Sequence, residues 1–249
     1  MCIVYNLTLL TPDRTLSQHI PKTDSLPKET PTLYLPPVSL PAPCDSEPMV
    51  PLEHQRVSVL SHYWHAGFSK ARPGAFLRSH TAELLYSAAD SLPDGFSLAV
   101  LDAWRSLELQ SELYNTYKKD PLVSDDHIHP PSQDPSTPPP HLTGGTVDVT
   151  LAWRGSPLAL GTGFDDFSPA TATHFFEDSP GLVRDLRRVL VTAMLNQGFV
   201  SINSEWWHFE FGTRLWASVN KTVPLYSPSD VVLSDASRFT NRLRIMTAQ

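Results

Sequence analysis

The segment Ser204-Glu205-Trp206-Trp207-His208-Phe209 places a carboxylate three residues ahead of a histidine, inside an aromatic run. Charge is costly to bury unless it is paired or bound to a metal. A zinc site would account for both side chains, with His208 as a ligand and Glu205 as the group that moves protons to and from water. A hydrogen-bonded pair on a strand is the alternative, and Glu-x-x-His alone does not distinguish the two.

A second polar segment lies upstream. His141 is followed by Leu142-Thr143-Gly144-Gly145-Thr146-Val147-Asp148, and the paired glycines allow a sharp turn after the histidine. Residues Thr146–Trp153 alternate in polarity, which predicts a strand with Asp148 on its polar face. A loop histidine and a strand aspartate can then converge, and with His208 they form three ligands with an open position, the pattern of a catalytic zinc site. Taken singly, the first two could be a loop histidine and a turn-capping carboxylate.

Regular elements are expected around these segments. The predicted helices are Thr81–Ser91, Ser106–Lys118 and Pro180–Gln197. The predicted sheet elements are a strand over Phe96–Trp104 and an antiparallel hairpin over Phe199–Ile202 and Glu205–Phe211. Ser179 is expected to be the N-cap of the last helix and Gly198 its stop. Together these elements indicate an α+β fold with a central antiparallel sheet and flanking helices.

Arg105 directly follows the predicted strand over Phe96–Trp104. An arginine at the end of an apolar strand is often simply exposed to solvent. Its functional alternative is to stabilise an oxyanion that forms on a carbonyl near the metal.

Prolines divide the chain. Nine of the 24 prolines lie between Pro21 and Pro51, where neither a regular helix nor a central strand can form. We therefore expect a proline-rich N-terminal arm over residues 1–55 and a catalytic domain over residues 56–249. A second cluster of seven prolines from Pro121 to Pro140 indicates a long excursion, in which His127 and His129 are expected to be exposed loop residues rather than ligands.

Composition excludes several classes of function. The net charge is −7 and there is no long basic run, so nucleic acid is not an expected partner. No stretch approaches 18 consecutive apolar residues, so no membrane span is expected. Cys2 and Cys44 cannot form a disulfide framework, and the first ten residues lack the features of a secretory signal. These features favour a cytoplasmic protein.

The order of these motifs resembles that of the D-alanyl-D-alanine dipeptidases (VanX-like), which belong to a superfamily of zinc peptidases with the cell-wall DD- and LD-carboxypeptidases. The matching pieces are Asp102-Ala103-Trp104-Arg105, His141 to Asp148, Phe164-Asp165 and Glu205-Trp206-Trp207-His208. The similarity extends from about Val57 to Phe211. Each motif is only moderately specific, but all of them in this order are a strong signal. The resemblance implies the zinc fold of the DD-peptidases.

The resemblance also implies a role for each residue. The ligands of one Zn²⁺ would be His141, Asp148 and His208. Glu205 would be the general base that takes a proton from the zinc-activated water and passes it to the leaving amine. Arg105 would steady the tetrahedral intermediate, and Asp165 would meet the free α-amine of the substrate. The implied activity is zinc-dependent hydrolysis of a short peptide such as D-Ala-D-Ala, linked to peptidoglycan of the cell wall.

This chain departs from the family pattern Ser-x-His-x-x-Gly-x-Ala-x-Asp at three places. The serine is Pro139, the alanine is Thr146, and Ser106 follows the arginine where proline is usual. Proline offers neither a hydroxyl nor an N–H to a substrate amine. The ligands and the base are intact while part of the substrate frame differs, which fits a shifted or relaxed substrate better than an inactive enzyme.

Two other functions remain open on the sequence. The same metal fold could act on another amide, or use a redox metal in specialised metabolism, because two histidines and a carboxylate also suit Fe(II). The fold could instead be a non-catalytic zinc-binding module, although a structural site needs no base such as Glu205.

Overall fold

The computed structural model describes residues 9–26, 39, 47–121, 123 and 127–229, and its core is one mixed sheet. The sheet has six strands, in the order β2-β4-β5-β8-β7 with β6 paired to β5. These strands are β2 (Val57–Val59), β4 (Phe96–Asp102), β5 (Thr146–Trp153), β6 (Ser156–Pro157), β7 (Val200–Ser201) and β8 (His208–Glu210). A separate two-stranded sheet pairs β1 (Met49–Pro51) with β3 (Phe76–Arg78).

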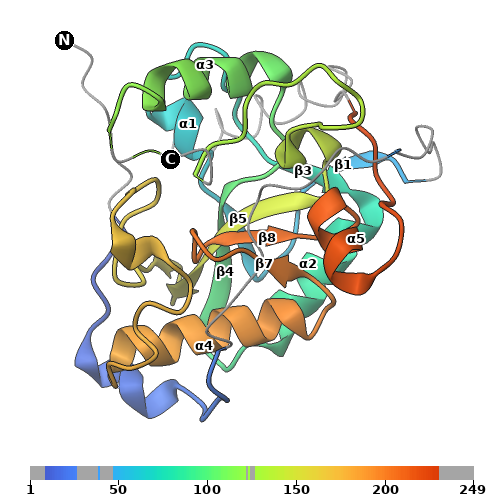
Figure 1. Cartoon of the computed structure of the whole chain (residues 1–249). Helices are drawn as coiled ribbons and strands as arrows, with labels where there is room; N and C mark the ends of the chain where they lie inside the picture. The colour runs from blue at the N-terminus through green and yellow to red at the C-terminus, as the bar shows by residue number, and fades with distance from the viewer. Residues whose placement is uncertain (1–8, 27–38, 40–46, 122, 124–126, 230–249) are drawn as a thin grey trace, which may run out of the picture.

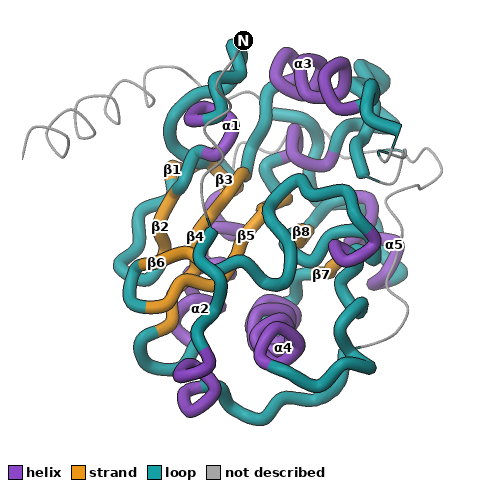
Figure 2. The backbone as a smooth tube through the Cα atoms, turned by 90° about the vertical axis from the view of Figure 1, so that its left-hand side faces the viewer, coloured by secondary structure: helices purple, strands orange, loops and turns teal. Residues whose placement is uncertain are grey.

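Helices lie on both sides of the main sheet. Figures 1 and 2 show α4 on one side and α1 and α3 on the other. The α-helices are α1 (His62–His65), α2 (Ser79–Ser91), α3 (Leu107–Tyr117), α4 (Leu182–Leu195) and α5 (Arg214–Asn220). Short 3₁₀ helices are η1 (Arg14–His19), η2 (Pro140–Thr143) and η3 (Pro169–Thr171). The α+β class predicted from the sequence is confirmed.

The sheet is not wholly antiparallel. β2 pairs with β4 in parallel, whereas the other pairs of the main sheet are antiparallel. Parallel neighbours need a long crossover connection, and here the chain passes through α1, β3 and α2 between them. The expected antiparallel sheet is therefore correct for the strands that carry the polar motifs and wrong at β2.

The core lies between the sheet and α4. Leu186, Leu190 and Met194 recur along one face of α4 and are fully buried, as their spacing predicts. α4 packs against α2 and β5. Each fully buried aliphatic side chain contributes about 1.5–3 kcal/mol relative to exposure, so this face anchors the sheet.

Three local expectations were wrong in detail. α4 begins at Leu182, and its N-cap position is held by Gly181, whose carbonyl accepts from Asp185, rather than by Ser179. Both faces of β5 are buried up to Ala152, because helices and loops cover the sheet on both sides. Residues 205–207 form a turn and not a strand, since the His208 amide bonds back to the Glu205 carbonyl.

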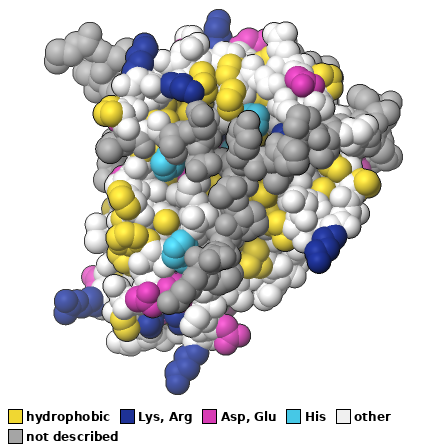
Figure 3. All heavy atoms as spheres, viewed as in Figure 1, with side chains coloured by type: hydrophobic (Ala, Val, Ile, Leu, Met, Phe, Trp, Pro, Cys, Tyr) yellow, Lys and Arg dark blue, Asp and Glu magenta, His cyan; other side chains and the backbone are white. Residues whose placement is uncertain are grey.

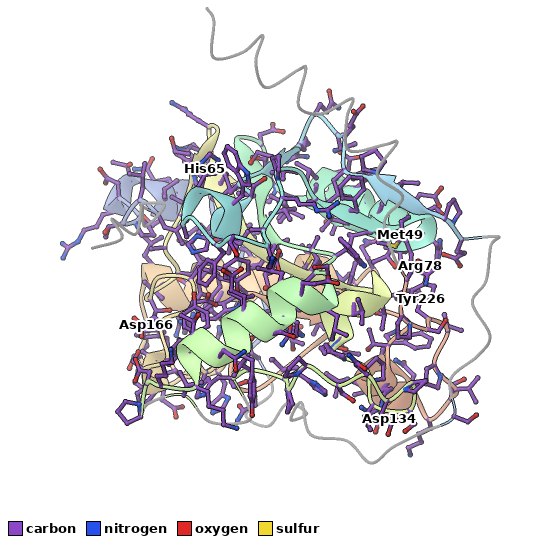
Figure 4. All side chains as sticks on the ribbon, turned by 90° about the horizontal axis from the view of Figure 1, so that it is seen from above. Met49, His65, Arg78, Asp134, Asp166 and Tyr226 are labelled. Carbon is purple, nitrogen blue, oxygen red and sulfur yellow. The ribbon has the colours of Figure 1, made fainter. Side chains whose placement is uncertain are left out.

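A buried arginine holds η2 in place. Arg78 donates to the carbonyl oxygens of Glu47 (3.0 Å), Thr143 (3.0 Å) and Ser227 (2.9 Å). Its guanidinium also lies 5.4 Å from the centre of the Tyr226 ring, and Figure 4 shows these two side chains close together. Arg78 thereby connects β3 and the segments around Glu47 and Ser227 to the turn that carries His141.

Figure 3 shows Lys and Arg side chains scattered over the visible face rather than gathered in one patch. Within the described ranges, none of the helices combines the length and apolar character needed to cross a bilayer. Much of the predicted proline-rich arm, together with Cys2 and Cys44, lies outside the described residues. The division at residues 55 and 56 therefore stays a prediction.

Candidate active site

Two neighbouring strands and one turn bring the predicted ligands together, and a third strand places Asp102 beside them. In the sheet, Asp102 of β4 pairs with Asp148 of β5, and Asp148 pairs with His208 of β8. η2 adds His141 from the side. One ligand atom each of His141, Asp148 and His208 lies within 4.8 Å of the others, and all three residues are buried. Strand register thus places side chains that are far apart in sequence around one point.

Hydrogen bonds orient both imidazole rings. The Nδ1–H of His141 donates to the Ala103 carbonyl (2.6 Å), which leaves its Nε2 3.4 Å from an Asp148 oxygen. The Nε2 of His208 bonds to Glu210 (3.0 Å), which leaves its Nδ1 3.1 Å from the other Asp148 oxygen. Fixing one ring nitrogen so that the other faces the ion is characteristic of metal-binding histidines.

The protonation of these groups suits a cation. Burial, together with the nearby Arg105, lowers the pKa of His141 to about 3, so the imidazole is neutral and able to ligate. Burial also opposes charge on His208, but hydrogen bonds to Asp148 and Glu210 outweigh it and raise its pKa to about 10. A bound cation would take the place of the proton on Nδ1. The donor set therefore fits a divalent metal ion.

Glu205 lies beside this cluster. Its Oε2 is 3.7 Å from the His208 Nδ1, and its side chain is buried. Burial raises the pKa of Glu205 well above its usual value. The backbone carbonyl of Glu205 accepts from the Thr173 hydroxyl (3.2 Å), which fixes the turn. Glu205 is thus a desolvated carboxyl group next to the candidate ligands.

Arg105 is buried, contrary to the solvent-exposed alternative. It contacts Asp102 through Nε (2.9 Å) and one terminal nitrogen (2.8 Å), and it donates to Gln110 (2.8 Å). The terminal nitrogen that contacts Asp102 also lies 3.9 Å from Asp148 and 3.3 Å from the Tyr63 hydroxyl. Asp102 and Gln110 hold the guanidinium so that its edge faces the metal-binding cluster.

Asp165 occupies an unusual backbone conformation at the cavity wall. Its φ is +54°, a left-handed value that is uncommon outside glycine and often marks functional sites. One carboxylate oxygen accepts from the Tyr63 hydroxyl at 3.4 Å, and the Tyr117 hydroxyl also bonds to this carboxyl group. The other oxygen is buried and has no hydrogen-bond partner among the described residues. Burial raises the pKa of this carboxyl to about 6. An amine donor would satisfy the unpaired oxygen.

These groups surround a cavity of about 450 Å³, a volume that includes its mouth. Its walls are lined by Tyr63, Arg105, Gln110, Tyr117, His127, Ile128, His129, Pro140, His141, Asp148, Asp165, Phe167, Glu205, Trp207 and His208. The lining includes the six residues to which the resemblance gives a role: Arg105, His141, Asp148, Asp165, Glu205 and His208. The cavity is lined by Pro140 rather than by Pro139, the residue that departs from the family pattern.

Two predictions change at the cavity. His127 and His129, expected to be exposed, are half-buried parts of its wall, although neither belongs to the metal-binding cluster. Glu210 and Gln110 were not singled out from the sequence. Glu210 could have been found, because it lies two residues after His208 and therefore on the same face of the strand. Gln110 carried no such signal.

The buried cluster of two histidines and one aspartate could hold a metal ion, and with a glutamate beside it the arrangement is the kind found in metallohydrolases. Residues 76–227 match the family described as D-Ala-D-Ala dipeptidase, peptidase family M15. The match covers more than half of the chain, and the protein therefore belongs to this family.

Individual relatives match shorter regions. A D-alanyl-D-alanine dipeptidase of Synechocystis sp. is 35% identical over 98 residues, covering 35% of this chain and 40% of the relative. One of Escherichia coli K12 is 31% identical over 117 residues, covering 47% of this chain and 55% of the relative. The chain thus spans about half the length of these relatives.

A crystal structure of the vancomycin-resistance D,D-dipeptidase VanXYg with a D-Ala-D-Ala phosphinate analogue is a distant likeness. Its sequence identity is 18% and its TM-score is 0.37, over 67% of this chain and 60% of that chain.

Proposed function

We propose that this protein is a zinc-dependent dipeptidase that hydrolyses a short peptide, with D-Ala-D-Ala as the first candidate. The observation that carries the proposal is the buried cluster of His141, Asp148 and His208 with Glu205 3.7 Å from the His208 Nδ1. A structural metal site would have no use for this adjacent carboxylate. Membership of the family and the names of its relatives support the choice of substrate.

His141, Asp148 and His208 would hold the zinc ion. When bound, the ion supplies Lewis acidity, which polarises a carbonyl and lowers the pKa of water. Glu205 takes a proton from the attacking water and delivers it to the nitrogen of the leaving amine. Its burial keeps bulk water away from this proton transfer, and the raised pKa makes it a competent base once it is ionised.

Arg105 and Asp165 would hold the substrate. Arg105 is fixed by Asp102 and Gln110 and would stabilise the negative charge that develops on the carbonyl oxygen. The unpaired oxygen of Asp165 would accept a hydrogen bond from the substrate α-amine. The scissile bond would then lie between the amine-binding wall and the metal ligands.

A substrate panel tests this function. We expect hydrolysis of at least one peptide from a set of D,D, L,D and L,L dipeptides, and loss of the activity when a chelator removes the metal. Metal analysis of protein purified without added ions should find zinc. Turnover that survives chelation, or no hydrolysis of any peptide or small amide, would rule the proposal out.

Two variants separate the roles of the motif residues. Glu205→Ala is expected to keep the metal and lose most of the activity, whereas His208→Ala should lose both. Equal loss of metal in the two variants would make Glu205 a ligand and overturn its assignment as the base.

A further inference from the structure

A second and larger space, a groove, adjoins the cavity at the wall formed by Asp165. It has a volume of about 1190 Å³, mouth included, and lies between α1, α3 and residues 163–166. Asp165 and Tyr117 line both spaces, so the groove begins where the amine of a dipeptide would lie. Its far side is formed by Glu112 and Thr116 of α3, and Figure 4 shows Asp166 beside this helix.

The acidic and basic side chains that line this groove are carboxylates and one histidine. Asp165, Asp166 and Glu112 line it, and no Lys or Arg is among its described lining residues. Lys70 acts on Glu112 and Arg105 acts on Asp165 without lining the groove, whereas Asp166 has no such cation among the described residues. Two of the carboxylates are held in place by backbone amides. Asp166 accepts from the amide of Ser168 (2.9 Å), and Glu112 accepts from the amides at positions 69 (3.0 Å) and 70 (2.9 Å). A ligand in this groove would be cationic at its outer end.

An independent observation shows that a lining residue of the groove lacks a hydrogen-bond partner. His62 lines the groove and is only 6% exposed, yet its Nδ1 is buried without a hydrogen-bond partner among the described residues. Its ring packs edge-on against Phe164, with ring centres 4.8 Å apart. Buried polar groups normally have a partner, so a ligand with an amide or a hydroxyl group would satisfy this nitrogen.

We propose that this groove is a subsite for one further residue attached to the amine of the dipeptide, so that the substrates include tripeptides with a free N-terminal ammonium. This inference rests on the proposed function, because the scissile bond keeps its place at the metal ligands. Asp165 then accepts from an amide N–H in place of an amine. One added residue extends the chain by about 3.5 Å, which carries the ammonium from Asp165 toward Asp166 and Glu112.

The test compares D-Ala-D-Ala, Gly-D-Ala-D-Ala and N-acetyl-Gly-D-Ala-D-Ala by the release of D-alanine. We expect the wild-type protein to cleave the free tripeptide with a kcat/KM within about tenfold of the dipeptide, and the acetylated tripeptide about tenfold less well. Asp166→Asn keeps its oxygen for the amide of Ser168 but removes a charge. It should weaken cleavage of the free tripeptide by raising KM and leave the acetylated tripeptide and the dipeptide unchanged.

A blocking variant tests the location. Thr116→Trp would fill the groove and should lower kcat/KM for the tripeptides by about tenfold or more while sparing the dipeptide. Asn115→Trp is the matched control, since it is exposed on the same helix and does not line the groove. Cleavage of the dipeptide without the tripeptides, or equal effects of the two tryptophans, would overturn the subsite and leave the proposed function standing. Cleavage of neither would overturn both.

Discussion

Glu210, a residue outside the sequence motifs, orients the imidazole ring of His208. It lies two positions after His208 on β8 and accepts the hydrogen of the His208 Nε2 at 3.0 Å. We expect Glu210→Ala to weaken zinc affinity by about 10–100-fold, because the ring loses the partner that directs Nδ1 toward Asp148. Competition with a chromophoric chelator measures this. Glu210→Gln keeps an acceptor oxygen and should recover most of the affinity; an alanine variant with wild-type affinity would contradict the role.

Arg105 is expected to matter for the reaction and not for the metal. Arg105→Lys keeps a positive charge but loses the planar fork that engages Asp102 and Gln110 together. kcat on the best dipeptide should fall by about 100-fold, with zinc content unchanged. Arg184→Lys, at the half-buried start of α4, is the control because Arg184 does not line the cavity. A large rise in KM with kcat unchanged, or a fall in zinc content, would contradict the role assigned to Arg105.

At the scale of elements, Arg187 of α4 connects two active-site segments. It is fully buried and donates to the carbonyl oxygens of Leu160, Ala170 and Ala172, each at 2.7 Å. Its guanidinium also lies 5.6 Å from the centre of the Trp206 ring. The segment that carries Asp165 is thereby held against the turn that carries Glu205.

Replacing Arg187 should destabilise the protein. Arg187→Met leaves the carbonyl oxygens of Leu160 and Ala170 without a donor, while that of Ala172 keeps the Phe175 amide. Removing the buried charge recovers part of this cost, and we expect a net loss of about 2–3 kcal/mol in the free energy of unfolding. Urea denaturation measures it. Arg184→Met on the same helix removes only an ion pair with the exposed Asp185 and should cost well under about 1 kcal/mol. Equal losses would show that the carbonyl contacts are not what Arg187 contributes.

The β5–β8 pairing depends on a close backbone approach at Gly145. A Cβ there would lie 2.2 Å from the Phe211 carbonyl oxygen, and the Phe211 amide donates to the Gly145 carbonyl. Gly145→Ala should therefore push the strands apart and lower both the midpoint of thermal unfolding and zinc affinity, because His208 lies on β8. Gly163→Ala meets no atom within 4 Å and serves as the control. An unchanged midpoint for Gly145→Ala would refute the packing argument.

At the scale of the whole molecule, metal binding should stabilise the fold. The ligands come from β5, β8 and η2, so the site exists only when the chain is folded. Zinc at about 100 times its Kd should add about 2.7 kcal/mol to the free energy of unfolding, raising the midpoint by about 5–10 °C. The shift should vanish in His141→Ala and persist in His127→Ala. Loss of the shift in the latter would make His127 a ligand.

The motifs could be predicted from the sequence because their chemistry is local. A histidine and a glutamate in an aromatic run, and a histidine before two glycines and an aspartate, carry their own indication of a metal site. Helices α2, α3 and α4 followed from apolar spacing, since one buried face imposes a 3.6-residue period. The two proline clusters could also be recognised from the sequence. The prediction that His127 and His129 are exposed was wrong, because the local sequence does not show which part of the protein a loop packs against.

The sequence by itself thus determined the α+β class, and it predicted the three candidate ligands and the candidate base that the structure brings together. Only the tertiary structure decided the rest: the parallel β2–β4 pair, the alignment of Asp102, Asp148 and His208 across three strands, the buried arginines, and the groove that adjoins Asp165. The physical reason is that strand register and burial depend on contacts between residues far apart in the chain. Local spacing limits which side chains share a face, but it does not specify which faces meet.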